Sequence, residues 1–585
     1  MSRGRGLACG LATLVGLGVV LAACAQVPRQ GAVEEVKERP VLSEVQGQYY
    51  LPKGPQPGDS PGDIVAGFLQ AMTATPLQTR SAQEFLSAGA RPRWHPQRVL
   101  AYRSRTLSPG RSHVVVLLHG ANQVGVDGQW QGQVPRAGER LDIRVVRENG
   151  EWRIARAPDE LVVPGTYYDQ HYQEAEIYFF DPSGRILVPE PVHVQQGTGL
   201  ASALVRALAH GPSHALGGAE RSFLPSGLTA TPVTVSASGV ADVTLRGTDV
   251  GPLSRRTTQQ VETQLSWTLR QDPSISSFRL TIDGRQALDA TGSPILRFTS
   301  VANDPRDPAV SQASSLFFAL RRGRLVSGAI NQPTKVDGPF GTQRLGIGAF
   351  AVSLDGDQVA GVTPTGLLVG PAGLTGGPAT AVRVLSGPGL LRPSWDFAGR
   401  LWEVRNGPSG AVVYDVRRHH AQRVPIPGIS GHLVRRFLVS RDGSRLVAVL
   451  RGTSSDRIAV SRLRYDSNGG AKRATPARSI PWVSGAARIR DIGWTSPTTI
   501  EVLDQLSGTQ AEVRILNVDG STSADEAPTS AIPGPTLGLV TSPVDAQTPY
   551  AVQQRSLYDL AQIDTTAPSV AVVSTTHLHH IAYAG

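Results

Sequence analysis

Cysteine, methionine and lysine are scarce in this chain. Its 585 residues include two cysteines, two methionines and four lysines. So few cysteines exclude a disulfide-stapled scaffold. After Cys24 no run approaches about 18 consecutive apolar residues, the length needed for a membrane-spanning helix, which excludes a multi-span membrane protein. Charged residues make up 18% and hydrophobic residues 40% of the chain, which excludes a disordered polyelectrolyte.

Glycine and proline, by contrast, are abundant, with 63 and 43 residues. Both residues mark turns, so many short strands are expected. At roughly 150 residues per domain, the length predicts three or four domains. The composition therefore favours a multidomain, strand-rich protein with real hydrophobic cores.

The first 24 residues carry the most specific signal. Arg3 and Arg5 form a basic start, residues 6–23 are apolar and small, and the stretch ends in Leu-Ala-Ala-Cys. This order is typical of a secretory signal peptide. Leu-Ala-Ala-Cys is also a lipobox as in bacterial lipoproteins, which predicts cleavage between Ala23 and Cys24, S-diacylglycerol on the Cys24 sulfur and N-acylation of its amine. The alternatives are an ordinary signal with a chance cysteine, or an uncleaved anchor helix.

Cysteine usage agrees with a lipid anchor. Cys9 would be removed with residues 1–23, which leaves Cys24 as the only thiol of the mature chain. An internal disulfide, thiol catalysis and cysteine-ligated zinc are then excluded. Two acyl chains anchor a protein firmly, whereas one is marginal. The expected location is the cell membrane, lipid-anchored on the extracytoplasmic face.

Residues 24–62 are predicted to form a Pro-rich tether, because this stretch is polar, contains many prolines and shows no regular spacing of apolar residues.

Residues 63–168 are predicted to form a small α+β domain. It begins with a capped helix from Asp63, and a second helix is expected to carry Phe85 and Leu86. An Asn-Gly pair predicts a tight hairpin between the last two strands. Strands are expected over residues 112–119, 140–146 and 151–156.

Residues 174–290 predict a second α+β domain. A strand, a turn at Asp181-Pro182-Ser183-Gly184 and a second strand come first. Apolar spacing then predicts helices over 200–209 and 257–269. Further strands are expected over residues 233–245 and 277–282.

Residues 305–585 repeat a strand, a tight turn and a second strand. Ser-x-Asp-Gly stands at 353–356 and 440–443, and a related Ser-Trp-Asp at 394–396. A recurrence at roughly 40 to 50 residues predicts a β-propeller, here of about six blades. Aspartate in such turns accepts hydrogen bonds from nearby backbone amides, so these aspartates are predicted to be structural rather than metal ligands.

The order of these parts resembles one known family. The hairpin at Val145–Ile154 resembles the nuclear-transport-factor-two-like fold, and Pro225–Thr229 with Gly239–Leu245 resembles the GerMN domain. Lipobox, tether with Gly54–Asp63, two α+β domains and propeller together resemble the LpqB lipoprotein family of actinobacteria, whose GC-rich genomes agree with the arginine-heavy composition. This resemblance implies an accessory lipoprotein of the MtrA–MtrB two-component system. It also implies contact with the extracytoplasmic domain of an MtrB-like sensor kinase, and a role in cell-wall homeostasis and cell division.

Motifs for catalysis are hard to find. A phosphate-binding loop is excluded because no Gly-Lys pair exists, and H-E-x-x-H is absent. Two stretches are rich in histidine. Arg417–His420 is interpreted as a blade loop, and for His577–His580 adventitious metal binding is only a disfavoured alternative. No enzyme activity, catalytic residue, metal or cofactor is therefore predicted. The alternative to a kinase modulator is a lipoprotein that binds or processes cell-wall polymer.

Charge is unevenly placed along the chain. The net charge of +10 conceals +15 over residues 301–490 and −8 over residues 491–585. The basic part predicts a surface for anionic lipid headgroups, anionic wall polymer or an acidic sensor domain. The alternative is a solvated surface neutralised between neighbouring blades. Nucleic acid is not an expected partner, because no aromatic and basic residues interleave as in strand-binding grooves.

Overall fold

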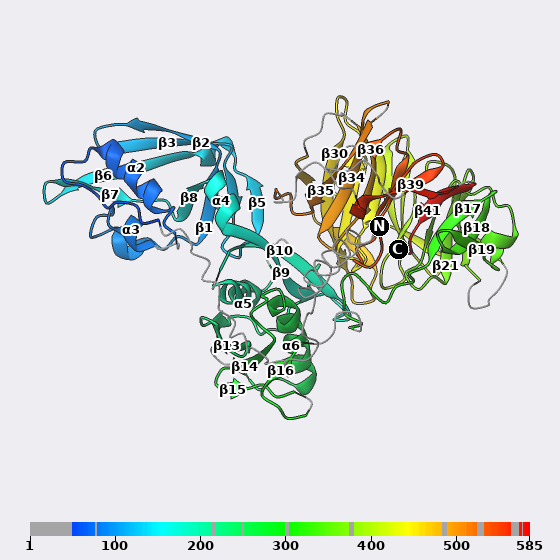
Figure 1. Cartoon of the computed structure of the whole chain (residues 1–585), viewed down its shortest axis with the longest axis horizontal. Helices are drawn as coiled ribbons and strands as arrows, with labels where there is room; N and C mark the ends of the chain where they lie inside the picture. Colours follow the sequence, from blue (N-terminus) through cyan, green and yellow to red (C-terminus); the bar gives the residue numbers. More distant parts are fainter. Residues whose placement is uncertain are drawn as a thin grey trace, which may run out of the picture.

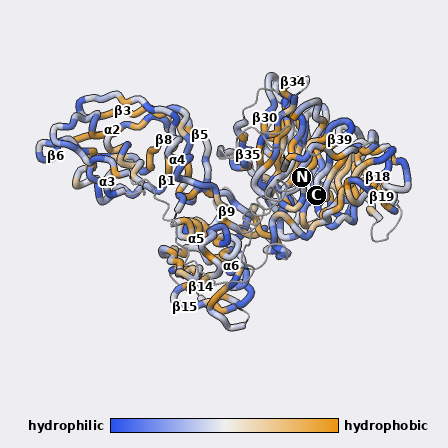
Figure 2. Tube along the Cα trace, in the orientation of Figure 1, coloured by the Kyte–Doolittle hydropathy of each residue, from blue (hydrophilic) through white to orange (hydrophobic). Residues whose placement is uncertain are grey.

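The computed structural model describes residues 50–75, 79–197, 199–212, 218–247, 251–289, 291–298, 304–373, 380–482, 488–508, 510–522, 532–562, 572–575 and 577–585. These residues form three domains, with the second lying between the first and the C-terminal sheets in Figure 1. Hydrophobic segments alternate with hydrophilic ones along the strands of all three (Figure 2). None of the described helices is both long and apolar enough to cross a bilayer.

The first domain contains two four-stranded sheets, ordered β5-β4-β1-β8 and β2-β3-β6-β7. Helix α2 packs on strands of both and buries Ile64, Phe68 and Leu69. The expected hairpin turn is present, because Asn149 and Gly150 both adopt positive φ, as a type I′ turn requires. Its elements are α2 (Pro61–Ala71), α3 (Thr79–Gln83), β1 (Arg98–Tyr102), β2 (Ser104–Pro109), β3 (His113–His119), β4 (Asn122–Val124), β5 (Trp130–Gln133), β6 (Arg140–Glu148), β7 (Glu151–Arg156), β8 (Glu160–Pro164) and α4 (Gly165–His171).

Three expectations for this domain need correction. The first helix begins at Pro61 rather than at Asp63, and its cap is Ser60, with Asp63 in the first turn. The second helix ends at Gln83, so Phe85 and Leu86 lie after it and not on it. Both are buried, and the backbones of Phe85 and Leu86 pair with Ile154 of β7, so their apolar character reflects strand contact rather than a helix face. The domain also begins before residue 63, because Tyr50 pairs with Thr75 in a β-bridge.

The second domain is built on a long antiparallel hairpin and a twisted sheet. Strands β9 and β10 pair over their full length, and β13 lies parallel to β14 in the sheet order β11-β13-β14-β15. Helices α5 and α6 pack against β9 and against each other. The elements are β9 (Tyr172–Phe180), β10 (Leu187–Gln195), α5 (Leu200–His210), β11 (Thr229–Ala230), β12 (Thr234–Val235), β13 (Val240–Arg246), α6 (Arg255–Leu269), β14 (Ser277–Ile282), β15 (Arg285–Gln286) and β16 (Leu296–Arg297).

The C-terminal part consists of six antiparallel sheets, taken in order along the chain, which is the arrangement of a propeller. The last strand, β41, pairs with β17 in the first sheet and closes the ring. Its strands are β17 (Phe317–Arg321), β18 (Arg324–Ala329), β19 (Gln332–Lys335), β20 (Ala349–Val352), β21 (Gln358–Thr363), β22 (Gly366–Pro371), β23 (Val382–Ser386), β24 (Ser394–Trp395), β25 (Leu401–Gly407), β26 (Gly410–Arg417), β27 (His420–Arg423), β28 (Val434–Val439), β29 (Arg445–Leu450), β30 (Arg457–Tyr465), β31 (Ala471–Ala474), β32 (Arg478–Ile480), β33 (Ile489–Trp494), β34 (Thr499–Ser507), β35 (Gln510–Asn517), β36 (Ile532–Pro533), β37 (Gly538–Val540), β38 (Tyr550–Val552), β39 (Ser556–Asp559), β40 (Val572–Ser574) and β41 (Leu578–Ala582).

The repeated aspartates hold the turns between the first and second strands of their sheets. Asp442 Oδ1 accepts a hydrogen bond from the backbone N–H of Ser444 at 2.6 Å, and Asp355 Oδ1 accepts one from Asp357 at 3.1 Å. Asp396 Oδ1 accepts from Ala398 at 3.0 Å. The structural role expected from the sequence is therefore confirmed for these three aspartates.

Candidate functional site at the domain junction

The β9–β10 hairpin joins the three domains. The backbone N–H of His193 donates to the carbonyl of Gly128 in the first domain at 2.7 Å. The imidazole of His193 lies 5.3 Å from the Trp130 ring, while its Nε2 lies 3.1 Å from Asp519 Oδ2 of the C-terminal sheets. One strand of the second domain thus contacts both of the others, as its position in Figure 1 also shows.

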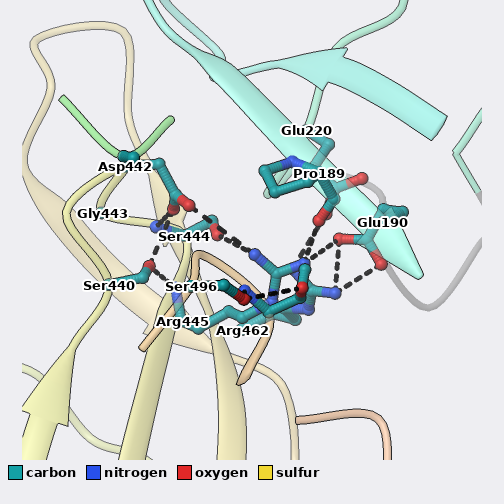
Figure 3. A network of polar contacts seen from close by, with 12 residues as sticks. Pro189, Glu190, Glu220, Ser440, Asp442, Gly443, Ser444, Arg445, Arg462 and Ser496 are labelled. Carbon is teal, nitrogen blue, oxygen red and sulfur yellow. Dashed lines mark hydrogen bonds and ion pairs between the residues drawn. The ribbon is translucent and has the colours of Figure 1, made fainter. Parts of the chain in front are cut away.

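A buried network of charges lies where β10 meets the C-terminal sheets (Figure 3). Arg445 Nη2 lies 2.9 Å from Glu190 Oε1 and also donates to the carbonyl of Pro189. Arg462 donates to Glu190 as well, and its Nη1 lies 3.2 Å from Glu220 Oε1. Four of these side chains therefore come from two domains and meet away from solvent: Glu190 and Glu220 from the second domain, Arg445 and Arg462 from strands β29 and β30.

One of the repeated turns completes the network. Arg445 Nη1 lies 3.7 Å from Asp442 Oδ2 and donates to Ser444 Oγ at 3.2 Å. The backbone N–H of Arg445 in turn donates to Ser440 Oγ at 3.0 Å. The turn therefore holds Arg445 through contacts within its own sheet, in addition to its contacts with the second domain. None of Glu190, Glu220, Asp442 or Arg445 is more than 7% exposed.

The charges of the network shift each other's titration. Burial would raise the pKa of Glu190, but the guanidinium groups of Arg462 and Arg445 outweigh burial and lower it. Burial and then the negative charge of Glu190 raise the pKa of Glu220 well above its ordinary value. Burial and then Arg462 lower the pKa of Arg445. The raised pKa of Glu220 favours its protonated form, so that the two guanidinium groups face Glu190 as their shared anion.

This arrangement can hold two domains together, and it supplies no catalytic geometry. Its carboxylates are occupied by guanidinium groups rather than aimed into a substrate cleft. In the described part of the chain, no group of three or more His, Cys, Asp or Glu side chains is placed to hold a metal ion. The junction is therefore a candidate site for coupling between domains.

The site residues expected from the sequence lie elsewhere. Ala23 and Cys24 fall outside the described residues. The Arg417–His420 stretch forms the turn between β26 and β27, where Arg418 and His419 adopt positive φ. His579 and His580 lie at the start of β41 and line a cavity together with residues of other inner strands.

Sequence reasoning missed Glu190 and Glu220. The available signal for Glu190 was its place between two prolines in a strand whose other residues are mainly apolar, since a buried carboxylate needs a partner.

Sequence reasoning also missed a match to the G-x-S-x-G nucleophile pattern at Gly58–Gly62. There Ser60 caps α2, and its Oγ donates to Asp63 Oδ2 at 2.6 Å, which is a structural role.

Family models match all three domains. Residues 54–168 match the N-terminal domain of lipoprotein LpqB, residues 176–288 match a model described as sporulation and spore germination, and residues 323–566 match the lipoprotein LpqB β-propeller domain. A solved structure, the first GerMN domain of the sporulation protein GerM from Bacillus subtilis, is 25% identical. It covers 22% of this chain and 97% of its own, with a TM-score of 0.18.

Curated relatives match over nearly the whole length. Lipoprotein LpqB of Mycobacterium bovis strain BCG is 30% identical, over 81% of this chain and 85% of that protein. Lipoprotein LpqB of Thermobifida fusca is 27% identical over 90% and 92%, and that of Mycolicibacterium smegmatis 28% identical over 94% of each. Because two LpqB models match its first and last domains and a 30% identical LpqB lipoprotein aligns over 81% of its length, this chain belongs to the LpqB lipoprotein family.

Proposed function

We propose that this chain is a non-enzymatic lipoprotein, anchored through Cys24 on the extracytoplasmic face of the cell membrane, that modulates an MtrB-like two-component sensor kinase. Through the kinase it would tune cell-wall homeostasis and cell division. Confinement by the lipid to the surface that also holds the kinase raises the effective concentration of the two partners. A modulator of this kind shifts signalling only if the two states of the kinase bind it differently.

The observation that carries the proposal is the junction. The β9–β10 hairpin contacts the first domain through Gly128 and the propeller through Arg445 and Arg462. A partner that binds one domain therefore meets a surface whose orientation is set by the other two. This is the property of a scaffold for protein contact, and the curated relatives are named lipoprotein LpqB, which is not the name of an enzyme.

We also propose a fold for each of the first two domains. We assign the first domain to the nuclear-transport-factor-two-like fold, supported by helix α2 packed on two sheets and by the hairpin β6–β7. We assign the second domain to the GerMN fold, supported by the match over residues 176–288.

Co-purification tests the function. The whole chain, purified in detergent, is mixed with the extracytoplasmic domain of the kinase or with purified cell wall. We expect retention by the kinase domain, weakening steeply with salt because residues 301–490 carry a net charge of +15. Retention by cell wall with none by the kinase domain would favour the wall-binding alternative and contradict the proposal. Retention that salt does not weaken would contradict the role of the basic residues.

Membrane fractionation tests the anchor separately. Cys24→Ala removes the sulfur that would carry diacylglycerol, so we expect that variant to leave the membrane fraction. Cys9→Ala is the matched control, because Cys9 lies within the predicted signal peptide, and it should fractionate as the unmodified chain does. Complete retention of Cys24→Ala in membranes would show that lipidation is not the anchor.

A further inference from the structure

The inner strands of the propeller sheets lie around a common centre. Strand β20 contacts β24 and β41, and β33 contacts β28 and β37. Each of β20, β24 and β28 ends at one of the aspartate turns, at Ser353, Asp396 and Ser440. One end of the central channel therefore carries the turns, and the other end carries the beginnings of these strands.

The end with the turns is closed by the protein itself. The backbone N–H of Gly585 donates to the carbonyl of Val352 at 2.8 Å. Arg441 donates to the carbonyls of Ala584 at 2.6 Å and Ala309 at 3.2 Å. Burial lowers the pKa of Arg441 to about 10. The turn that holds Arg441 also holds Asp442 of the junction, so this end faces the second domain.

The opposite end contains an open cavity of about 470 Å³. Its lining comes from the beginnings of β20, β28, β33, β37 and β41 and from the segment before β24. Cavities of roughly 300–1,000 Å³ are the usual size for small-molecule sites. Because this end lies away from the junction, a ligand could reach it without displacing another domain.

Two arginines and two histidines from three different elements converge on this cavity. Arg392, Arg436, His579 and His580 line it, and Asp491 is the one acidic residue among its described lining. Asp491 is already engaged, because its Oδ1 lies 3.1 Å from Arg436 Nε and its Oδ2 accepts from the Leu539 N–H at 3.0 Å. Partial burial, then the charges of Arg392 and His579, lower the pKa of His580, which favours its neutral form and leaves the positive charge of the cavity to the arginines.

Arg392 is exposed, and within the described residues its guanidinium forms no hydrogen bond or close ion pair, although the charge of Asp491 acts on it. The backbone beside it is held in place. The neighbouring Leu391 N–H donates to Glu403 Oε1 and to the carbonyl of Val404, both at 3.0 Å. A positioned guanidinium with free donors is suited to a phosphate or carboxylate group.

Apolar side chains lie beside these charges. Leu390 and Leu539 line the cavity, and so does Leu537, which is 55% exposed although it is a large hydrophobic residue. An exposed leucine next to a cationic cavity offers a surface for the apolar part of a ligand whose charged part meets the arginine.

We propose that the open end of the propeller channel binds a small organic anion, with its phosphate or carboxylate group on Arg392 and Arg436 and its apolar part on Leu537. The ligand is a free molecule of the cavity's size rather than a polymer or a membrane surface. The test of this site is independent of the kinase contact proposed above, because binding of a small molecule requires neither the lipid anchor nor a protein partner.

Calorimetric titration of the whole chain in non-ionic detergent tests this site. Three probes are compared: inorganic phosphate, phenyl phosphate, and dihexanoyl phosphatidylglycerol below its micelle concentration. Phenyl phosphate should bind more tightly than inorganic phosphate, because only it has an apolar part. Tighter binding of the short lipid than of phenyl phosphate would contradict a free molecule as the ligand and would indicate a lipid headgroup.

Variants locate the binding. Arg392→Gln should weaken phenyl phosphate binding about tenfold or more, since a charge-assisted hydrogen bond is lost. Arg457→Gln, a matched change at an exposed arginine of β30 outside the cavity, should leave it unchanged. Leu537→Ala should weaken phenyl phosphate but not inorganic phosphate. Equal effects of Arg392→Gln and Arg457→Gln, or no binding of any probe at millimolar concentrations, would overturn the proposal.

Discussion

Glu190 and Arg445, which lie 255 residues apart in the chain, form a 2.9 Å ion pair inside the junction between the second domain and the propeller. Neither side chain is more than 5% exposed. A buried pair of this kind gains little over a well-packed apolar contact, but it is costly to break because the remaining charge stays buried. The pair therefore makes the relative placement of the two domains specific.

Loss of the Glu190 carboxylate should loosen the junction. Glu190→Gln keeps the size of the side chain but leaves the Arg445 and Arg462 guanidinium groups without their shared anion, at a cost of about 3–5 kcal/mol. We expect a lower melting temperature and faster hydrogen–deuterium exchange across β10. Glu160→Gln is the control, because Glu160 pairs with the 42% exposed Arg98 at 3.1 Å and such surface pairs contribute about 0–1 kcal/mol. Equal shifts for the two variants would contradict the role of the junction pair.

The junction should also respond to pH through Glu220. Its folded-state pKa is raised above 4.5 by burial and by Glu190, so the protonated form is the one that the fold favours. The stability that Glu220 contributes is thus present below pH 4.5 and is lost as the pH rises toward its folded-state pKa. The melting temperature of Glu220→Gln, compared with that of the unmodified chain at the same pH, should therefore rise as the pH increases from 5 to 9. A difference between the two chains that stays constant over this range would show that Glu220 does not titrate in this way.

The core of the first domain should depend on Phe68. Its ring is fully buried on α2 and lies 5.3 Å from the Trp94 ring. Phe68→Ala should cost about 3–5 kcal/mol through lost burial and a residual cavity. Thermal unfolding followed by tryptophan fluorescence measures the change. Leu51→Ala serves as the control, because Leu51 is 61% exposed and should shift the transition little.

Closure of the propeller should depend on β41. This strand completes the first sheet against β17, and Ile581 is 4% exposed within it. Ile581→Asn places an amide in that apolar contact and should lower the melting temperature by several degrees. His577→Asn is the matched control just before the strand, because His577 is exposed and its φ of +74° suits asparagine. An unchanged melting temperature for Ile581→Asn would contradict closure by β41.

Much of the local structure could be predicted from the sequence. The apolar spacing indicated the helix that the structure has as α2, although the cap expected at Asp63 was wrong because Ser60 caps this helix, and the strand expected over 277–282 matches β14. The Asn149-Gly150 pair indicated its hairpin for a physical reason, because both residues tolerate positive φ. Phe85 and Leu86 were misassigned to a helix, since a short apolar pair fits either a helix face or a strand.

The partners of single charged residues could not be predicted. Glu190, Glu220 and Arg462 are ordinary charged residues in the sequence, and their meeting depends on how two domains pack. The same holds for Arg392, His579 and His580, which are brought to one cavity only because the ring closes. For the histidine-rich end of the chain, adventitious metal binding was only a disfavoured alternative, and the structure places two of its histidines in a cavity with two arginines.

The sequence by itself determined the order of the domains, the lipobox at Cys24 and the repeated aspartate turns, because each depends on residues that are close together in the chain. Tertiary structure alone decided which charges are buried together at the junction and which remain unpaired at the channel end. Those outcomes depend on contacts between residues that are far apart in the chain. Burial strengthens the electrostatic attraction between such residues, and no local sequence pattern indicates it.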